Sequence, residues 1–165
     1  MTGTGYTFYS KSAGLEISAT RTIKRNRIQG RVRFRLFPLE EGGRERQVIL
    51  MLDPLESFGL SRLIRQAVSE KRTFKGVLIH KSEKDGLEST AILDVEARER
   101  KGSTIFGFTV VRTNGDRSKT RRVSIALDEI SVLFAAKLLG RLAVDTAYEI
   151  PVNGEAAGNN EEVPF

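Results

Sequence analysis

The sequence repeats itself at a spacing of about 75 residues. Residues 48–53 align with 123–128 at a shift of 75, and residues 32–36 align with 106–110 at a shift of 74. The one-residue difference falls in the loop between these segments, where an insertion costs little free energy. A chain that repeats in this way has to bury the apolar faces of two similar units. We therefore predict two related halves, at about 4–70 and 73–148.

Each half has the pattern of four strands followed by one helix. Apolar and polar residues alternate in most strand candidates, as in strands with one buried face. Residues 48–52 are apolar throughout and are predicted to form a central strand. The order predicts an α+β fold of two antiparallel sheets with helices. The expected strands are 6–9, 15–20, 30–37 and 46–53 in the first half, and 73–81, 87–98, 104–112 and 121–127 in the second.

Both helices begin with a capping signal. Asp53, Pro54 and Glu56 have the spacing of a capping box with proline in the first turn, and Asp128 is the matching cap in the second half. The second helix, 129–142, is apolar around more of its surface than one buried stripe needs. This excess predicts a homodimer or homotetramer with that helix at the contact. The first helix is expected to end near residue 70 and to bury Leu55, Phe58, Leu63, Ile64 and Ala67.

Residues 24–37 hold six basic side chains and no acidic one. From Gly30 onward the alternation is strict and points Arg31, Arg33 and Arg35 to the exposed face, about 7 Å apart at twice the rise per residue. A ladder of guanidiniums favours a polyanionic ligand. The alternative is a solvated face whose charges prevent aggregation of the sheet.

Binding of single-stranded nucleic acid needs a basic groove and aromatic rings on which bases stack. Phe37 continues the face of the three arginines and is the best stacking candidate. Basic residues recur in the same zone of the second half, where Lys119 and Arg121 match Arg44 and Arg46. The predicted nucleic-acid-binding residues are Tyr9, Lys11, Lys24, Arg25, Arg27, Arg31, Arg33, Arg35, Phe37, Arg44, Arg46, Lys75, Arg112, Lys119 and Arg121.

The duplicated order of four strands and a helix resembles the whirly fold of plant single-stranded DNA-binding proteins. It is also similar to the dimeric transcriptional coactivators and mitochondrial RNA-binding proteins of that superfamily. The segment Tyr9-Ser-Lys-Ser-Ala-Gly-Leu15 lies where whirly proteins carry Lys-Gly-Lys-Ala-Ala-Leu, with Lys11 displaced and Ser12 in place of the second lysine. The resemblance implies a domain over 1–149 that binds single-stranded DNA or RNA.

Residues 161–165, Glu-Glu-Val-Pro-Phe, resemble the acidic tip of bacterial and phage single-stranded DNA-binding proteins. That tip follows a Gly-rich linker, and residues 150–160 are rich in Gly, Asn and Ala, which predicts a flexible linker here. The resemblance implies that the tip recruits replication and repair proteins. The residues of the tip are Glu161, Glu162, Val163, Pro164 and Phe165.

Composition narrows the function further. The net charge of +6 and a pI near 9.8 favour nucleic acid over acidic metabolites. The sequence has no cysteine and one histidine, His80, and it has no phosphate-binding loop and no His or carboxylate cluster with metal-ligand spacing. We therefore predict a non-enzymatic protein without metal or cofactor. The absence of a leader and of an apolar run of ~20 residues favours the cytoplasm, at the nucleoid or in a host cell if the protein is viral.

The sequence thus predicts a protein that coats and protects single-stranded DNA in replication, recombination or repair. A helix after every fourth strand argues against a single five-stranded oligonucleotide-binding barrel. Two alternatives remain. One is a whirly-like protein that binds single-stranded RNA or regulates transcription, and the other is a non-enzymatic hub whose basic face binds acidic proteins.

Overall fold

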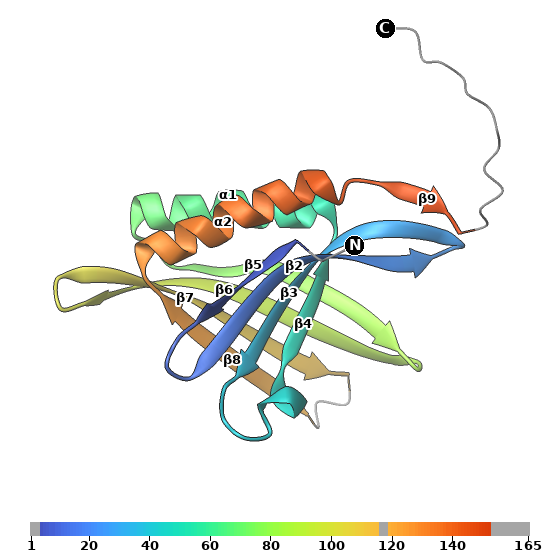
Figure 1. The fold of residues 1–165 in the computed structure, drawn as a ribbon. Coiled ribbons are helices and arrows are strands. Elements are labelled where there is room, and N and C mark those ends of the chain that lie inside the picture. The colour runs from blue at the N-terminus through green and yellow to red at the C-terminus, as the bar shows by residue number, and fades with distance from the viewer. Residues whose placement is uncertain (1–3, 116–118, 153–165) are drawn as a thin grey trace, which may run out of the picture.

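The computed structural model describes residues 4–115 and 119–152 and confirms the predicted α+β fold. Two antiparallel sheets lie beneath two helices (Figure 1). The first half comprises β1 (Gly5–Tyr9), β2 (Ala13–Lys24), β3 (Arg27–Pro38), the 3-10 helix η1 (Gly43–Arg46), β4 (Val48–Leu52) and α1 (Pro54–Glu70). The second comprises β5 (Phe74–Lys84), β6 (Leu87–Arg100), β7 (Ser103–Asn114), β8 (Thr120–Leu127), α2 (Glu129–Asp145) and β9 (Glu149–Pro151).

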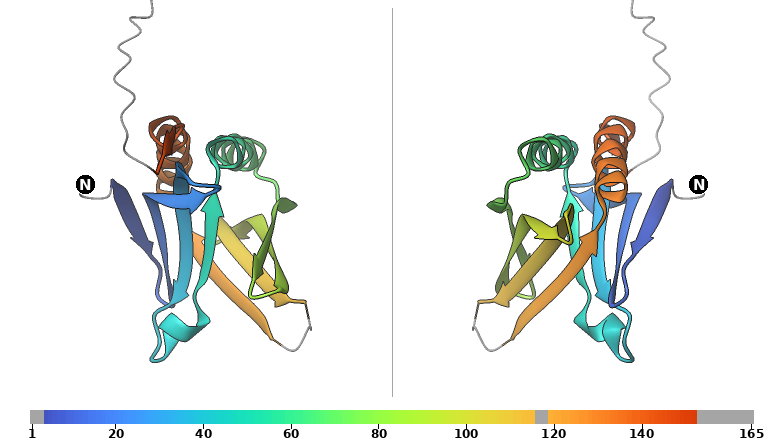
Figure 2. Two further views of the ribbon diagram at one scale, coloured as in Figure 1. Left: turned by 90° about the vertical axis from the view of Figure 1, so that its right-hand side faces the viewer. Right: turned by 90° about the vertical axis from the view of Figure 1, so that its left-hand side faces the viewer.

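The helices are exchanged between the two halves. The strand orders are β1-β2-β3-β4 and β5-β6-β7-β8, so each half builds its own sheet. Among the sheet strands, however, α1 packs mostly on β5 and β6, whereas α2 packs mostly on β2 and β3. Figure 2 shows this arrangement from both sides, with α1 above the second sheet and α2 above the first. Each sheet is therefore covered largely by the helix of the other half.

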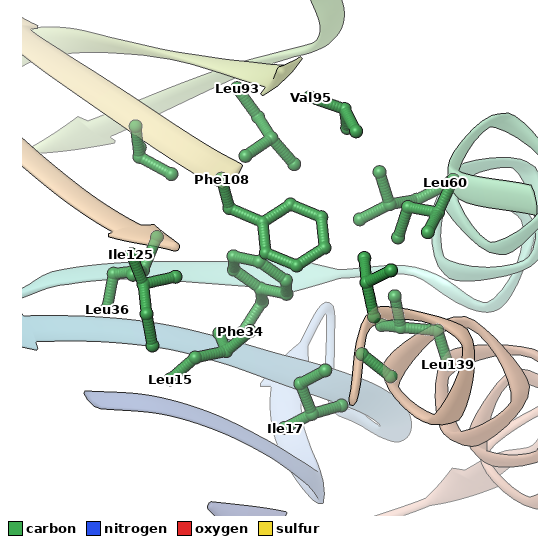
Figure 3. Close-up of a cluster of buried hydrophobic side chains, with 14 of the residues drawn as sticks. Leu15, Ile17, Phe34, Leu36, Leu60, Leu93, Val95, Phe108, Ile125 and Leu139 are labelled. Carbon is green, nitrogen blue, oxygen red and sulfur yellow. The ribbon is translucent and has the colours of Figure 1, made fainter. Parts of the chain in front are cut away.

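The core lies between the two sheets and the helix pair. Phe34 of β3 and Phe108 of β7 meet at its centre, with ring centroids 5.7 Å apart and an interplanar angle of 88°, a favourable edge-to-face geometry. Leu60 of α1 and Leu139 of α2 close the core from the helical side (Figure 3). The apolar residues predicted to be buried in the matched strands are all buried, namely Val32, Phe34, Leu36, Phe106, Phe108 and Val110.

The predicted cap of α1 is confirmed, but its predicted apolar stripe is wrong in part. Asp53 Oδ1 accepts from the backbone N–H of Glu56 at 2.8 Å, and Glu56 Oε2 accepts from that of Asp53 at 2.9 Å. Leu55 and Phe58 are 83% and 50% exposed. The helix is rotated away from the expected side because it packs closely against α2 through small residues. Its buried residues are Ser57, Leu60, Ser61, Ile64, Ala67 and Val68.

Strand β4 is an edge strand and not the central strand that its composition predicts. Among the described strands it pairs with β3 alone. A residue of the second half contacts β4: Arg112 of β7 donates a hydrogen bond to the carbonyl oxygen of Ile49 at 2.6 Å. The outward side chains of Ile49 and Met51 are half-buried beside arginines of β3. This partial cover explains why the strand is apolar on both faces.

The last described strand, β9, returns to the first sheet. It pairs with the start of β3, so that Gln29 lies opposite Glu149 and Arg27 opposite Pro151. The chain crosses β3 very closely on its way there, since a Cβ on Gly30 would lie 2.1 Å from the carbonyl oxygen of Thr146. The strand takes up the first two residues of the predicted linker, 150–160. The predicted tip, 161–165, lies outside the described residues.

Candidate nucleic-acid interface

A tight turn sets which side chains share the exposed face of the first sheet. Arg25 and Asn26 connect β2 to β3 with φ angles of 51° and 60°, left-handed values that asparagine tolerates better than most residues. The turn places Thr20, Ser18 and Glu16 directly opposite Arg31, Arg33 and Arg35. We call the three arginines, together with Tyr9 and Phe37 at one end, the basic outer face.

Glu16 lies in the middle of the basic outer face and binds two of its arginines. Its Oε1 atom accepts from Arg33, and its Oε2 atom is 2.5 Å from a terminal nitrogen of Arg35. Ser18 Oγ donates to the same Oε1 at 2.9 Å and accepts from Arg33 Nε at 3.3 Å. The predicted ladder is therefore partly neutralised by an acid from the neighbouring strand.

The protonation of Glu16 reflects this environment. Burial opposes its charged form, but the hydrogen bonds from Arg33 and Ser18 and the charges of Arg33 and Arg35 outweigh that effect. The pKa of Glu16 consequently lies below its usual range. The carboxylate is thus ionised at neutral pH, and it carries the charge that a bound anion would bring to the same guanidiniums.

The aromatic end of the face combines the exposed ring of Tyr9, the half-buried ring of Phe37 and a cation. The rings of Tyr9 and Phe37 have centroids 6.5 Å apart in an edge-to-face arrangement, and the guanidinium of Arg35 lies 4.7 Å from the centroid of Phe37. The tip of the Phe37 ring occupies the space above Gly14, where a Cβ would lie 2.3 Å away. Lys11 is exposed in the turn between β1 and β2. The predicted stacking residues therefore do lie beside the predicted phosphate-binding residues.

Two of the predicted binding residues near the β2–β3 hairpin, Arg27 and Arg31, already have hydrogen-bond partners in the protein. Arg31 donates to Gln29 Oε1 at 2.5 Å, and Arg27 pairs with Glu149 of β9 at 3.3 Å. Lys24 and Arg25 are exposed at the tip of the hairpin. A hollow beside them is lined by Lys24 and Arg31 and, from the second half, by His80 and Lys81 of β5.

A second basic cluster lies where β7, β8 and η1 meet. Arg112 is opposite Arg121 in register, and its burial, followed by the charge of Arg121, lowers the pKa of Arg112. η1, which carries Arg44 and Arg46, packs against both β3 and β8. The elements that carry Arg44, Arg46 and Arg121 thus lie together, and Lys119 immediately precedes β8. Of these, Arg46 is paired with Glu40 at 2.7 Å.

Lys75 does not join either basic group. It lies on the second sheet, where its ammonium contacts Asp94 at 3.3 Å and Glu96 at 3.0 Å. The hydrogen bond to Glu96, followed by that to Asp94, raises the pKa of Lys75. Glu96 also binds Arg98 at 2.6 Å. The two cations, Lys75 and Arg98, therefore balance the two acids, Asp94 and Glu96, on the exposed face of the second sheet.

His80 and the acidic residues form no metal site in the described parts of the chain. In 4–115 and 119–152, no group of three or more His, Asp or Glu side chains is placed to hold a metal ion. His80 is half-buried, with Nδ1 3.7 Å from Glu56 Oε1, a carboxylate already used by the helix cap. No helix in these ranges is long and apolar enough to span a membrane.

The sequence analysis did not single out Glu16 and Ser18, although Glu16 binds Arg33 and Arg35 and Ser18 binds Arg33. The alternation of Leu15 and Ile17 does place them outward, so the face was predictable. Their partners depend on the register of the hairpin, which follows from the turn at Arg25 and Asn26. Asn26 is the only local signal for that turn, and it stands inside a run of basic residues that looks continuous.

No protein-family model matches the sequence, and a comparison with curated proteins finds no match. Thirteen chains among the solved structures match this chain, and three of them illustrate the similarity in fold. They are the plant transcriptional regulator PBF-2 (TM-score 0.55, 13% identity, 88% of this chain and 83% of that chain), WHY1 from Arabidopsis thaliana (0.55, 12%, 88% and 86%) and WHY3 from Arabidopsis thaliana (0.51, 15%, 86% and 87%). These are whirly proteins, and the chain has a whirly-like fold.

Proposed function

We propose that the protein binds single-stranded nucleic acid on the basic outer face and that DNA is its physiological ligand. The proposal rests on one observation above all. Three guanidiniums and two aromatic rings share one exposed sheet surface, and one ring lies 4.7 Å from a guanidinium. Cations that hold phosphates beside rings that stack on bases are the two components of sequence-tolerant single-strand binding.

Each component has a separate role in this mechanism. Arg31, Arg33 and Arg35 bind phosphate oxygens, since a guanidinium offers paired donors that match phosphate geometry. Phe37 and Tyr9 stack on bases next to the phosphates, which orders the strand without selecting a sequence. A duplex hides its base faces, so rings on an open sheet surface favour single strands.

The test compares two sets of charge deletions. A variant with Arg31, Arg33 and Arg35 changed to Ala should bind oligo-dT more weakly, with the slope of log K against log salt reduced by roughly 2, at ~0.7 per phosphate contact. A control with Arg62, Arg65 and Arg141 changed to Ala removes the same charge from the helices. Equal losses in both variants would show only a net-charge effect. Equal affinity of the wild type for single-stranded and duplex DNA would favour the hub that binds acidic partners.

A role in replication, recombination or repair follows from the acidic tip. Under this proposal, Glu161–Phe165 recruits a partner protein while the folded domain coats DNA in the cytoplasm. Regulation of transcription is the second candidate, because PBF-2, which is similar in fold, is named a transcriptional regulator. Competition experiments with single-stranded DNA, single-stranded RNA and duplex promoter fragments distinguish these roles. Tighter binding of a promoter duplex would favour regulation of transcription, and tighter binding of RNA would overturn the assignment of DNA.

We also propose that the protein is a homodimer or homotetramer. Apolar side chains are exposed along the outer sides of both helices and form what we call the helical patch: Leu55, Phe58, Ile130, Leu133, Phe134 and Val144. Phe134 has Tyr6 of β1 beside it, with ring centroids 5.1 Å apart. We propose that a second copy covers these exposed side chains, because large apolar surfaces usually mark contacts between proteins.

A further inference from the structure

Within residues 4–115 and 119–152, Glu16 is the acid that binds the arginines of the basic outer face directly, and the position of its carboxylate matches that of a ligand. Both carboxylate oxygens are used, one by Arg33 and the other by Arg35. The Glu16 side chain is 15% exposed, whereas those of Arg33 and Arg35 are 40% and 30% exposed. The carboxylate of Glu16 is therefore closer to the sheet than the guanidiniums that it binds, and those guanidiniums remain accessible to solvent.

We propose that Glu16 is an internal competitor of the nucleic acid, a carboxylate that holds the phosphate-binding donors until a phosphate displaces it. This inference rests on the proposed function. Carboxylate and phosphate bind the same planar pair of guanidinium donors. A strand that binds Arg33 and Arg35 consequently exchanges one anion for another, and the affinity is lower than three free arginines would give.

The arginines do not need Glu16 to stay in place. Arg33 is also held by Ser18, whose Oγ accepts from its Nε atom at 3.3 Å. Arg35 donates to Gln47 Oε1 at 3.4 Å and lies over the ring of Phe37. Because these contacts remain when the carboxylate leaves, its removal should free donors and not disorder them.

The second half supplies a comparison. Glu16 lies opposite Arg35, and Asp94 lies opposite Thr109 at the matching place in the second sheet. Asp94 has a structural task, since its Oδ1 accepts from the backbone N–H of Gly76 at 2.7 Å. Glu16 binds only side chains in the described part of the chain. Its position is therefore better explained by the arginines than by the fold.

The experiment uses the full chain and titrates oligo-dT at several salt concentrations. Glu16→Gln keeps the shape and can still bond to Ser18, and Glu16→Thr is a second neutral variant suited to a strand. One regained phosphate contact should tighten binding about eight-fold at ~50 mM salt and steepen the slope of log K against log salt by ~0.7. Glu99→Gln, which removes an exposed acid elsewhere in β6, should leave both values near wild type.

The outcomes separate this inference from the proposed function. Unchanged or weaker binding by folded Glu16→Gln, while the triple arginine variant still loses affinity, overturns only the role of Glu16 as a competitor. No effect of the triple variant overturns the proposed function itself. Equal tightening by Glu99→Gln assigns the gain to net charge and also rejects the inference. If neither neutral variant folds, Glu16 serves the fold, and the inference is again wrong.

Discussion

Ser61 and Ala136 occupy equivalent positions in the two halves, 75 residues apart, and they touch: the Ser61 hydroxyl donates to the carbonyl oxygen of Ala136 at 2.6 Å. Phe34 and Phe108, which are also equivalent, meet in the same way between the sheets. A residue that contacts its own counterpart lies next to the axis that relates the two copies. These two contacts therefore trace a pseudo-twofold axis from the helix pair down into the core.

Gly30 should be intolerant of any side chain. A Cβ there would lie 2.1 Å from the Thr146 carbonyl oxygen, so Gly30→Ala has to push apart β3 and the chain that leads into β9. We expect a loss of ~1–3 kcal/mol in the free energy of unfolding, measured with urea. Gly59→Ala is the matched control, because a Cβ on Gly59 would meet no atom within 4 Å and alanine favours a helix. A stable Gly30→Ala protein would contradict the close crossing.

Phe37 should contribute to binding through its ring and not through its bulk. Phe37→Leu should weaken oligo-dT binding by ~1–3 kcal/mol if a base stacks there. Phe37→Tyr keeps an aromatic face and should bind nearly as well as the wild type. Titrations by fluorescence anisotropy distinguish the two. If leucine and tyrosine bind equally well, Phe37 only covers Gly14 and has no stacking role.

The helical patch should control assembly. Ile130 is 81% exposed, and Ile130→Glu places a charge in the proposed contact between subunits, where desolvation of that charge is costly. We expect light scattering to show a smaller species than the wild type at the same micromolar concentration. Lys101→Glu, a change in the exposed turn between β6 and β7, should not alter the mass. A wild-type protein that is already monomeric would remove the proposal.

The stability of the protein should fall in acid partly because of Glu16. Its pKa is lowered in the folded state, so the unfolded chain binds a proton more readily and the carboxylate stabilises the fold above its ordinary pKa of ~4.3. That contribution disappears as the pH falls through the lowered folded-state value. The wild type should therefore lose more stability than Glu16→Gln between about pH 5 and pH 3, followed by thermal unfolding. Parallel curves would contradict the charge-based account of the Glu16 contacts.

Removal of the acidic tip should affect partners more than nucleic acid. Deletion of residues 161–165 takes away Glu161 and Glu162 and leaves the basic outer face intact. Oligo-dT affinity should stay the same or rise slightly, most clearly at low salt, because acids close to a basic surface compete with phosphates. Capture of replication or repair proteins from the native host should be lost. A truncated protein with weaker DNA binding would place the tip in the binding site.

The sequence predicts whatever depends on local periodicity and misses whatever depends on how the halves meet. Phe34 and Phe108 follow from an alternation of two, and the Asp53 cap follows from four adjacent residues. The burial of Ser57 and Ser61 instead of Leu55 and Phe58 depends on the closeness of α2, which no local pattern encodes. The same holds for Glu16, whose partners need the hairpin register. It also holds for β9, which has only three residues and is defined by the edge that it joins.

The exchange of helices means that neither half is a domain in its own right. A single unit of four strands and a helix would leave much of its sheet and of its helix uncovered, and we expect it to be stable only when it pairs with a second unit. The present chain is in effect a dimer joined covalently, and the short connection at 71–73 keeps the two partners permanently together. The tether also releases them from the need to be identical. The second sheet can therefore pair Asp94 and Glu96 with Lys75 and Arg98, while the first sheet keeps the guanidiniums of Arg33 and Arg35 partly exposed beside Glu16.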